Sequence, residues 1–237
     1  MSESPIELRG IVKSYGSKEV LTGLDLAVPQ GAVVGLLGTN GCGKTTLLKC
    51  ALGLIRPKAG TTRLLDEDAW SLTAAAKMRI GYVPQVVGLY PWMKVRHLID
   101  YTAAFYPNWN HAMVANLVKE WSIPMDDRIG PLSVGQVQKL AILLAVGHEP
   151  DLLILDEPAA SLDPLARRQF LQMIIDMAEP GRRTVLFSTH ITSDLERVAD
   201  RVAILKSGRI AWFGLLDELK EQTHVSLEDS FLEMCRE

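Results

Sequence analysis

The sequence contains little cysteine. Only three cysteines occur among its 237 residues, Cys42, Cys50 and Cys235, and none belongs to a C-x-x-C pair. An odd number without paired spacing argues against a disulfide framework and against a zinc site. We therefore expect three reduced thiols.

The sequence also lacks any segment suited to crossing a membrane or to secretion. Its longest apolar runs, such as the one from Leu140 to Val146, are far shorter than the roughly 20 residues that span a bilayer. The first residues, Met1 to Pro5, have neither the basic nor the apolar region of a secretion signal. These absences predict a cytoplasmic protein.

Strong positive charge is missing as well. The formal net charge is −3 and the basic residues are dispersed along the chain. Proteins that bind nucleic acid usually concentrate lysine and arginine in one patch or stripe. We therefore expect no nucleic-acid partner.

The sequence does contain a phosphate-binding loop. Residues 38–45 read GTNGCGKT, which matches the G-x-x-x-x-G-K-[ST] pattern. Its glycines let successive backbone N–H groups point at a phosphate at the start of the next helix. Lys44 would bind the β- and γ-phosphates, and the Thr45 hydroxyl would bind Mg²⁺. An apolar strand at residues 32–37 and a helix at residues 45–52 are the flanks that favour this function over a plain turn.

Apolar strands and helical patterns alternate along the chain. Residues 151–156 and 183–189 read as fully buried strands, as expected for a mostly parallel sheet with helices on both faces. The stretch from Pro5 to Val28 has short runs broken by glycines, which predicts a small antiparallel β layer. We predict one α/β domain of the P-loop NTPase class over residues 1–237.

Seven aromatic residues are concentrated between Tyr90 and Trp121, where prolines interrupt a helical periodicity. This shift in composition predicts a helical subdomain inserted at about residues 87–145. Residues from about 208 to 237 read as a short C-terminal tail.

Two adjacent carboxylates, Asp156 and Glu157, end one of the buried strands, and His190 follows another. Ligands of open parallel sheets bind beyond the carboxyl ends of the strands, so these side chains should lie beside the phosphate loop. Asp156 can hold Mg²⁺, and Glu157 can act as general base on a water that attacks the γ-phosphate. The simpler alternative for the pair is an exposed acidic turn.

A further motif precedes the helical run from Val137 to Val146. Residues 132–136 read LSVGQ and resemble the L-S-G-G-Q signature of the ATP-binding cassette (ABC) ATPases, the nucleotide-binding subunits of ABC transporters. The resemblance extends from Ile6 to about Gly214, with every major motif in family order. It implies that ATP is the substrate and Mg²⁺ its metal ion.

The resemblance also implies roles for individual residues. Tyr15 matches the aromatic residue that stacks on adenine, Gln85 the glutamine that senses Mg²⁺ and the lytic water, and His190 the γ-phosphate histidine. Residues 161–163, Ser-Leu-Asp, match a loop at the dimer interface. The expected nucleotide contacts are Tyr15, Gly38, Thr39, Asn40, Gly41, Cys42, Gly43, Lys44, Thr45, Thr46, Ser133, Gly135, Gln136 and Asp163. The expected metal ligands are Thr45, Gln85 and Asp156, and the expected catalytic residues are Glu157, His190, Gln85 and Lys44.

These assignments have simpler alternatives. Tyr15 could be a packed surface tyrosine, Gln85 could cap a turn, and His190 could be a satisfied core histidine. Asp163 precedes Pro164 and could cap the next helix, a role compatible with an interface contact.

The signature implies that one chain is not enough. In the family, the helix end at Ser133 faces the nucleotide of a second ATP-binding subunit, so that two ATP molecules lie between two head-to-tail chains. This sequence has Val134 where the signature usually has glycine, which keeps the N–H but adds bulk. We expect altered closure or slow turnover from that departure. Whether the dimer contains two copies or one copy and a related cassette stays open.

The family also implies a membrane partner. The aromatic-rich insertion corresponds to the subdomain on which such subunits dock their integral membrane permease, although these aromatics could equally form its own core. The compact length resembles small bacterial exporter-type cassettes, located on the cytoplasmic face of the membrane. The alternatives are a soluble ABC ATPase acting on nucleic acid or ribosomes, and a GTPase or kinase. The weak negative charge argues against an ATPase that acts on nucleic acid or ribosomes. The lack of an N-K-x-D-type loop argues against a GTPase, and the signature at Ser133 argues against a kinase.

Overall fold

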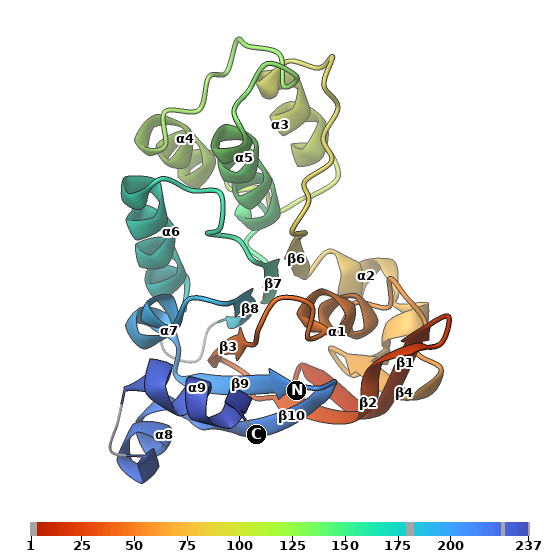
Figure 1. The fold of residues 1–237 in the computed structure, drawn as a ribbon. Coiled ribbons are helices and arrows are strands. Elements are labelled where there is room, and N and C mark those ends of the chain that lie inside the picture. Colours follow the sequence, from red (N-terminus) through yellow and green to blue (C-terminus); the bar gives the residue numbers. More distant parts are fainter. Residues whose placement is uncertain (1–3, 179–182, 224–225, 237) are drawn as a thin grey trace.

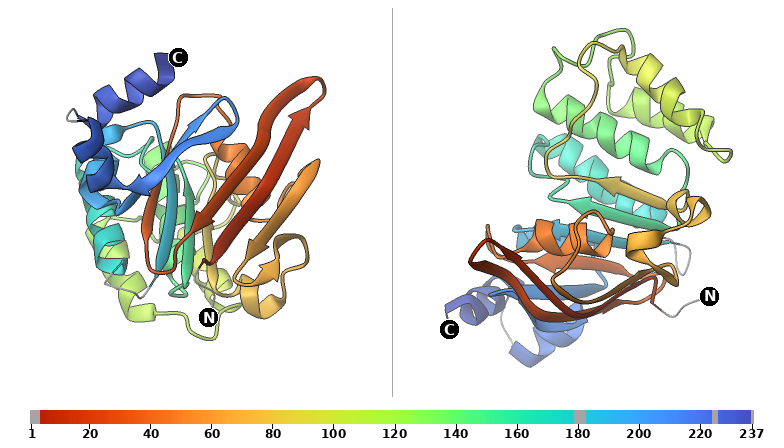
Figure 2. Two further views of the ribbon diagram at one scale, coloured as in Figure 1. Left: turned by 90° about the horizontal axis from the view of Figure 1, so that it is seen from below. Right: turned by 90° about the vertical axis from the view of Figure 1, so that its right-hand side faces the viewer.

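The computed structural model describes residues 4–178, 183–223 and 226–236. A central sheet carries helices on one side and an antiparallel β layer on the other, and a helical lobe extends beyond one end (Figures 1 and 2). The strands are β1 (Ile6–Tyr15), β2 (Lys18–Val28), β3 (Val33–Leu37), β4 (Ala59–Leu64), β5 (Glu67–Asp68), β6 (Ile80–Val83), β7 (Leu152–Asp156), β8 (Thr184–Thr189), β9 (Arg201–Lys206) and β10 (Arg209–Leu215). The helices are α1 (Lys44–Ala51), α2 (Ala74–Lys77), α3 (Val95–Ala103), α4 (His111–Glu120), α5 (Val134–Val146), α6 (Pro164–Met177), α7 (Thr192–Val198), α8 (Leu216–Thr223) and α9 (Leu227–Arg236), with a short 3₁₀ turn at Ala69–Ser71.

The central sheet has the strand order β10-β9-β3-β8-β7-β6. Its neighbours from β9 to β6 pair in parallel, and β10 pairs with β9 antiparallel. This arrangement confirms the α/β fold and the mostly parallel sheet. The strand expected at residues 183–189 begins at Thr184, one residue later.

Strands β3, β7 and β8 are buried on both faces because their alternate side chains enter two different cores. On β3, Val33 and Leu37 belong to the core under the helices, whereas Val34 and Leu36 belong to the core under the antiparallel layer. Side chains alternate between faces along a strand, so a continuous apolar run is what a sheet covered on both sides requires.

The predicted antiparallel β layer is confirmed and extends further than expected. β1 pairs with β2 and also with β4, and the four-stranded sheet has the order β2-β1-β4-β5. Helix α1 lies between this layer and the central sheet, and its Leu47 and Leu48 are fully buried in the shared core. The phosphate loop that precedes α1 is therefore held between two sheets.

Helices α3, α4 and α5 form the lobe, and they lie in sequence between the adjacent strands β6 and β7 (Figure 1). Trp109 and Trp121 are buried, so these two aromatic residues belong to the hydrophobic core and not to a docking surface. Tyr90, Trp92, Tyr101 and Phe105 expose 46–68% of their surface. The aromatic cluster thus divides into a core group and a surface group.

The segment expected as a C-terminal tail begins instead with a strand of the central sheet. β10 pairs with β9 through a hairpin whose Ser207 and Gly208 both have positive φ, 49° and 76°. Two consecutive residues with positive φ make a turn that suits the twist of a two-residue hairpin. After β10, Leu219 of α8 and Leu227 of α9 are buried in the core under the helices.

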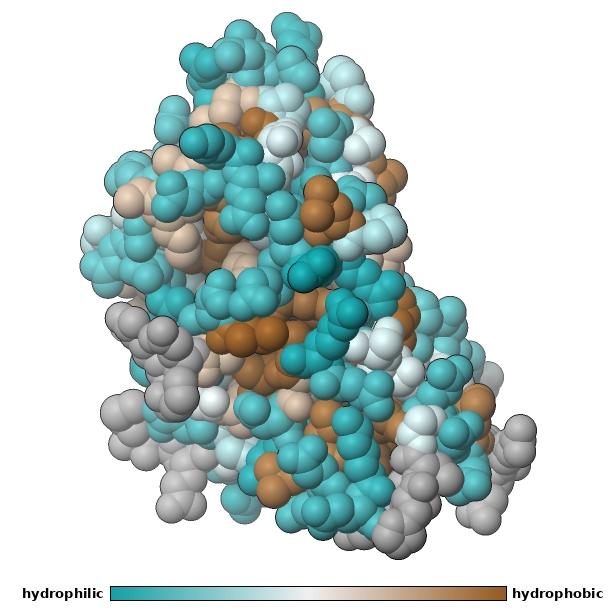
Figure 3. Space-filling model, turned by 90° about the vertical axis from the view of Figure 1, so that its left-hand side faces the viewer, coloured by the Kyte–Doolittle hydropathy of each residue, from teal (hydrophilic) through white to brown (hydrophobic). Residues whose placement is uncertain are grey.

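No helix in the part of the chain that the structure describes is both long and apolar enough to cross a bilayer. The face on the side of α6 and α7 is mainly hydrophilic, with hydrophobic residues gathered near its middle (Figure 3).

A close contact at Gly53 gives a test of how tightly the layers pack. Gly53 has φ of +67°, and a Cβ there would lie 1.9 Å from the carbonyl oxygen of Ala69. We predict that Gly53→Ala lowers the free energy of unfolding by about 3 kcal/mol, because it adds a backbone clash to an unfavourable φ. Gly23 has φ of +82° and no atom within 4 Å of an added Cβ, so Gly23→Ala should cost only about 1 kcal/mol. Urea unfolding followed by circular dichroism measures both values, and equal losses would contradict the packing described here.

Candidate nucleotide site

The phosphate loop joins the end of β3 to the start of α1. Gly41 and Gly43 have φ of +79° and +113°, and Gly43 is the N-cap of α1. An added Cβ at Gly43 would lie 3.2 Å from side-chain atoms of Val20 and Leu21. Glycine is thus required both by the backbone conformation and by the closeness of β2. The first turn of α1 leaves backbone N–H groups that can bind an anion.

Lys44 is held over this loop by several contacts. Its ammonium group donates to the carbonyl oxygens of Gly38 at 2.7 Å and Thr39 at 3.3 Å. It also forms an ion pair with Oε1 of Glu157 at 3.1 Å, and each side chain is only 6% exposed. The pair therefore joins the phosphate loop to the end of β7.

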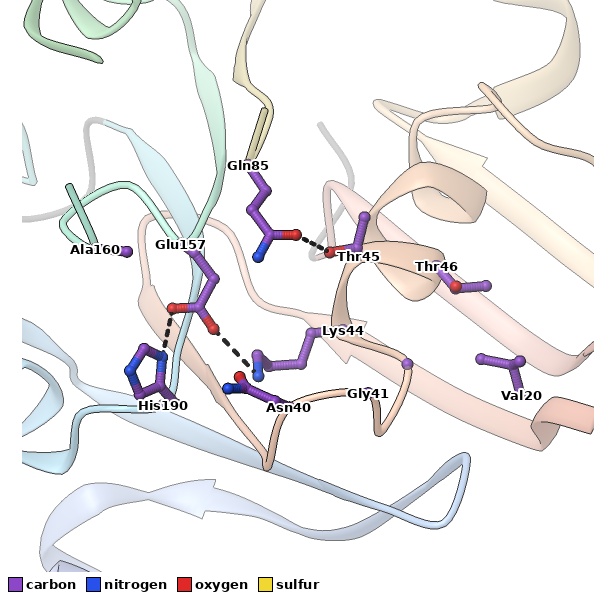
Figure 4. A pocket seen from close by; sticks show the side chains of 11 residues that line it. Val20, Asn40, Gly41, Lys44, Thr45, Thr46, Gln85, Glu157, Ala160 and His190 are labelled. Atoms are coloured by element: carbon purple, nitrogen blue, oxygen red, sulfur yellow. Dashed lines mark hydrogen bonds and ion pairs between the residues drawn. The ribbon is translucent and has the colours of Figure 1, made fainter. Parts of the chain in front are cut away.

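Glu157 contacts a second predicted residue through its other oxygen. Oε2 lies 2.9 Å from Nδ1 of His190, which follows β8 (Figure 4). Glu157 has a positive φ of 48°, an unusual conformation for a residue other than glycine. Its N–H donates to the hydroxyl of Ser188 at 2.9 Å, which helps to hold this turn.

Asp156 is fully buried, and one of its oxygens is satisfied by the same serine. The Ser188 hydroxyl donates to Oδ1 of Asp156 at 2.7 Å, so Ser188 links both carboxylate residues. We did not predict a role for Ser188 from the sequence. The available signal was its position at the end of a buried strand, where it pairs in register with Asp156.

Three groups at this edge fit a magnesium ion that is bound together with a nucleotide. The Thr45 hydroxyl donates to Oε1 of Gln85 at 3.3 Å. Oδ2 of Asp156 is buried and has no hydrogen-bond partner within the described residues. No cluster of three or more His, Cys, Asp or Glu side chains that could hold a metal occurs in those residues. Mg²⁺ usually keeps waters and takes one or two protein ligands together with phosphates, so the set is of the expected kind.

Thr45 and Gln85 line a cavity of about 420 Å³, whereas the fully buried Asp156, also predicted as a metal ligand, does not line it. Residues from the loop, α1, Gln85 and the ends of β7 and β8 face into it (Figure 4). Its lining residues are Val20, Asn40, Gly41, Gly43, Lys44, Thr45, Thr46, Gln85, Glu157, Ala160 and His190. Val20 and Ala160 were not predicted from the sequence, because an apolar residue at a site has no signal of its own.

Some predicted contacts lie outside this lining. The half-buried side chain of Cys42 packs against the core under the antiparallel layer. Tyr15 is 52% exposed, and the Lys13 ammonium lies 5.3 Å from the centre of its ring. An exposed aromatic face on β1 is available for stacking on a base.

The signature residues do not line the cavity either. Ser133 is the N-cap of α5 and forms a capping box with Gln136: the Ser133 hydroxyl accepts from the Gln136 N–H, and the Gln136 side chain accepts from the Ser133 N–H. Val134 is 70% exposed at the same end. Asp163 caps α6 by accepting from the N–H groups of Leu165 and Ala166, as the capping alternative predicted. Ser133 and Asp163 are thus the N-caps of α5 and α6, and both side chains are exposed to solvent.

Comparison with known proteins identifies the family. A family model described as "ABC transporter" matches residues 21–160, which include the phosphate loop, the signature and the two carboxylates. The chain belongs to the ATP-binding cassettes of the ABC transporter family. Its predicted family resemblance is thereby confirmed, and the family implies ATP binding and ATPase activity.

Individual relatives agree with this assignment. The cassette is 38% identical over 214 residues to a protein of Burkholderia orbicola named "Nod factor export ATP-binding protein I", covering 88% of this chain and 70% of the relative. It is 34% identical over 227 residues to "Uncharacterized ABC transporter ATP-binding protein YxlF" of Bacillus subtilis, covering 94% and 75%. A solved "ATP binding subunit of ABC transporter" matches with a TM-score of 0.87 and 28% identity, over 98% of this cassette and 99% of that chain.

The contacts of Lys44 predict the effect of removing it. Lys44→Ala should weaken ATP binding at least about 100-fold, because the loop loses its charged hydrogen-bond donor to the phosphates. Isothermal titration calorimetry measures the affinity. Lys49→Ala, at the last turn of the same helix, is the matched control and should bind ATP as the unchanged protein does. ATP affinity that survives Lys44→Ala would rule out this cavity as the nucleotide site.

Proposed function

We propose that this cassette hydrolyses MgATP within a head-to-tail dimer and drives a separate membrane permease, in the direction of export. The observation that carries the proposal is the position of Glu157, whose two oxygens contact Lys44 of the phosphate loop and His190. A carboxylate buried beside a phosphate loop, with a histidine in contact, is the arrangement that phosphoryl transfer to water needs.

The residues take separate roles in this reaction. Lys44 and the N–H groups at the start of α1 bind the phosphates of ATP. Glu157 accepts a proton from the attacking water, and His190 contacts the γ-phosphate and holds the Glu157 carboxylate in place. Thr45, Gln85 and Asp156 would hold Mg²⁺, which supplies positive charge for the oxygens of the transferred phosphoryl group.

A dimer is supported by the geometry of the signature. Ser133, Gly135 and Gln136 lie at the N-terminal end of α5, a place suited to a phosphate, yet none of them lines this chain's own cavity. A second subunit would present the same end to that cavity. The exposed Val134 would then lie in the interface, where its bulk slows closure.

We predict that Glu157→Gln binds ATP but hydrolyses it about 100 to 1,000 times more slowly, because the general base is lost. ATP should then stay bound and hold two chains together, which gel filtration detects as a dimer only when ATP is present. The matched control is the double variant Lys44→Ala with Glu157→Gln, which should stay monomeric at the same ATP concentration. A Glu157→Gln protein that binds ATP and still elutes as a monomer would contradict the sandwich.

A permease docking surface is supported by a second cavity of about 390 Å³ between α2 and α3. Tyr101 and Phe105 line it and contact each other edge to face, with ring centres 5.1 Å apart. They are 50% and 60% exposed, and Met78 at the same cavity is 43% exposed. Exposed aromatic residues around a groove are favoured anchors for a helix of a partner protein. We assign this groove to a cytoplasmic helix of the permease, and the relatives' name, Nod factor export, supports the direction.

Variants in this groove should lose binding to the permease but keep ATP hydrolysis. Tyr101→Ser with Phe105→Ser should reduce co-purification with the proposed membrane permease at least about 10-fold, because each lost aromatic anchor is worth about 1 to 2 kcal/mol. ATP hydrolysis by the purified cassette should stay unchanged. Ile175→Ser on α6, 44% exposed in the unchanged protein, is the control and should leave co-purification intact. Retention of the membrane protein by the double variant would place the docking surface elsewhere.

A further inference from the structure

Asp194 is a buried carboxylate that the reaction described above does not use. It lies in the first turn of α7, four residues after His190, and is 3% exposed. Its Oδ1 accepts from Nε of Arg167 at 2.7 Å, and another guanidinium nitrogen of Arg167 lies 2.7 Å from the same oxygen. The pair joins α7 to α6.

Arg167 belongs to the first turn of α6, next to the loop of residues 161–163. Its backbone N–H donates to the carbonyl oxygen of Asp163 at 2.8 Å. The Asp163 carboxylate caps the helix, and the N–H of Ala166, with a contribution from Lys139, lowers the pKa of that carboxyl. The start of α6 and the loop before it therefore form one fixed unit.

The same loop packs against the signature helix. A Cβ at Gly135 would lie 3.0 Å from the carbonyl oxygen of Ser161, so the two backbones are already close. The Lys139 ammonium of α5 lies 3.8 Å from Oδ2 of Asp163. A displacement of the start of α5 would therefore press on this loop.

We propose that Arg167 is a positioning residue that couples the signature helix to the catalytic histidine of the same chain. The contacts run from α5 to Asp163, through α6 to the Arg167–Asp194 pair, and through the first turn of α7 to His190 and Glu157. A nucleotide bound in the second subunit contacts the start of α5 and thereby sets the position of His190 in this chain. This inference rests on the proposed dimer.

The pair is partly buried, with the Arg167 side chain 28% and the Asp194 side chain 4% exposed, and such an ion pair is weak evidence for a role in stability. Replacing both members of such a pair with apolar residues of similar size is often neutral for stability, whereas removing one member leaves a buried charge. The double variant Arg167→Met with Asp194→Leu therefore removes the ion pair between α6 and α7 and keeps side chains of similar size in its place.

The experiment measures ATP hydrolysis by the full chain as a function of ATP concentration. The unchanged protein should show a Hill coefficient approaching about 2, the number of sites in the dimer. In the double variant we expect kcat to fall about 10-fold and the Hill coefficient to fall towards 1, at an unchanged thermal midpoint and unchanged ATP affinity. Arg168→Met, at the exposed neighbouring position on α6, is the control and should behave as the unchanged protein does.

Unchanged kcat and cooperativity in the double variant would overturn the inference while leaving the proposed function intact. Lack of cooperativity in the unchanged protein, together with lack of an ATP-dependent dimer in Glu157→Gln, would overturn the dimer and the inference together. Should the double variant fail to fold, Arg167→Lys decides the matter. It keeps the charge but loses the two-nitrogen contact, so an intermediate loss of cooperativity supports the inference and unaltered cooperativity overturns it.

Discussion

The ion pair between Lys44 and Glu157 is the contact on which the site depends. β3, which leads into the phosphate loop, and β7, which leads into Glu157, are separated in the sheet by β8. The ion pair connects their ends, and Ser188 of β8 and His190, just after β8, lie between them. Both charged side chains are nearly inaccessible to water, so the pair is tolerated only because backbone carbonyls contact Lys44 and a histidine contacts Glu157. A nucleotide's phosphates would compete for the same lysine.

The central sheet is covered on both faces, and this packing holds the strand ends around the nucleotide site in place. Alternate side chains of the central strands fill two separate cores, one shared with α1 and the antiparallel layer and one shared with the helices. The candidate catalytic residues at the ends of these strands are therefore held by packing on both faces of the sheet. The lobe of α3 to α5 shares the core under the helices, lies between β6 and β7 along the chain, and carries the signature and the exposed aromatic residues. The proposed chemistry and the proposed partner contacts thus lie on different parts of one chain.

Local patterns predicted much of this arrangement. The phosphate loop, the buried strands and the antiparallel layer all follow from glycine spacing and from the period of apolar residues. Ser133 and Gln136 show the limit of such patterns, because their side chains form a capping box in this chain and are also candidates for contact with a partner's nucleotide. The expected tail failed for another reason: residues 209–215 alternate weakly, and only pairing with β9 makes them a strand of the sheet. The contacts of Ser188 and the pairing of Arg167 with Asp194 could not be derived from the sequence, because each joins residues distant along the chain.

The sequence by itself determined the class of ligand, the fold and the family, because a phosphate loop between a strand and a helix is a local structure whose residues are all neighbours in the chain. The tertiary structure decided which side chains meet. It turned Cys42 towards the core and not into the cavity, brought Glu157 between Lys44 and His190, and left Tyr101 and Phe105 at the surface while burying Trp109. The physical reason is that burial and charge pairing depend on how strands order themselves in a sheet, and that order does not follow their order along the chain.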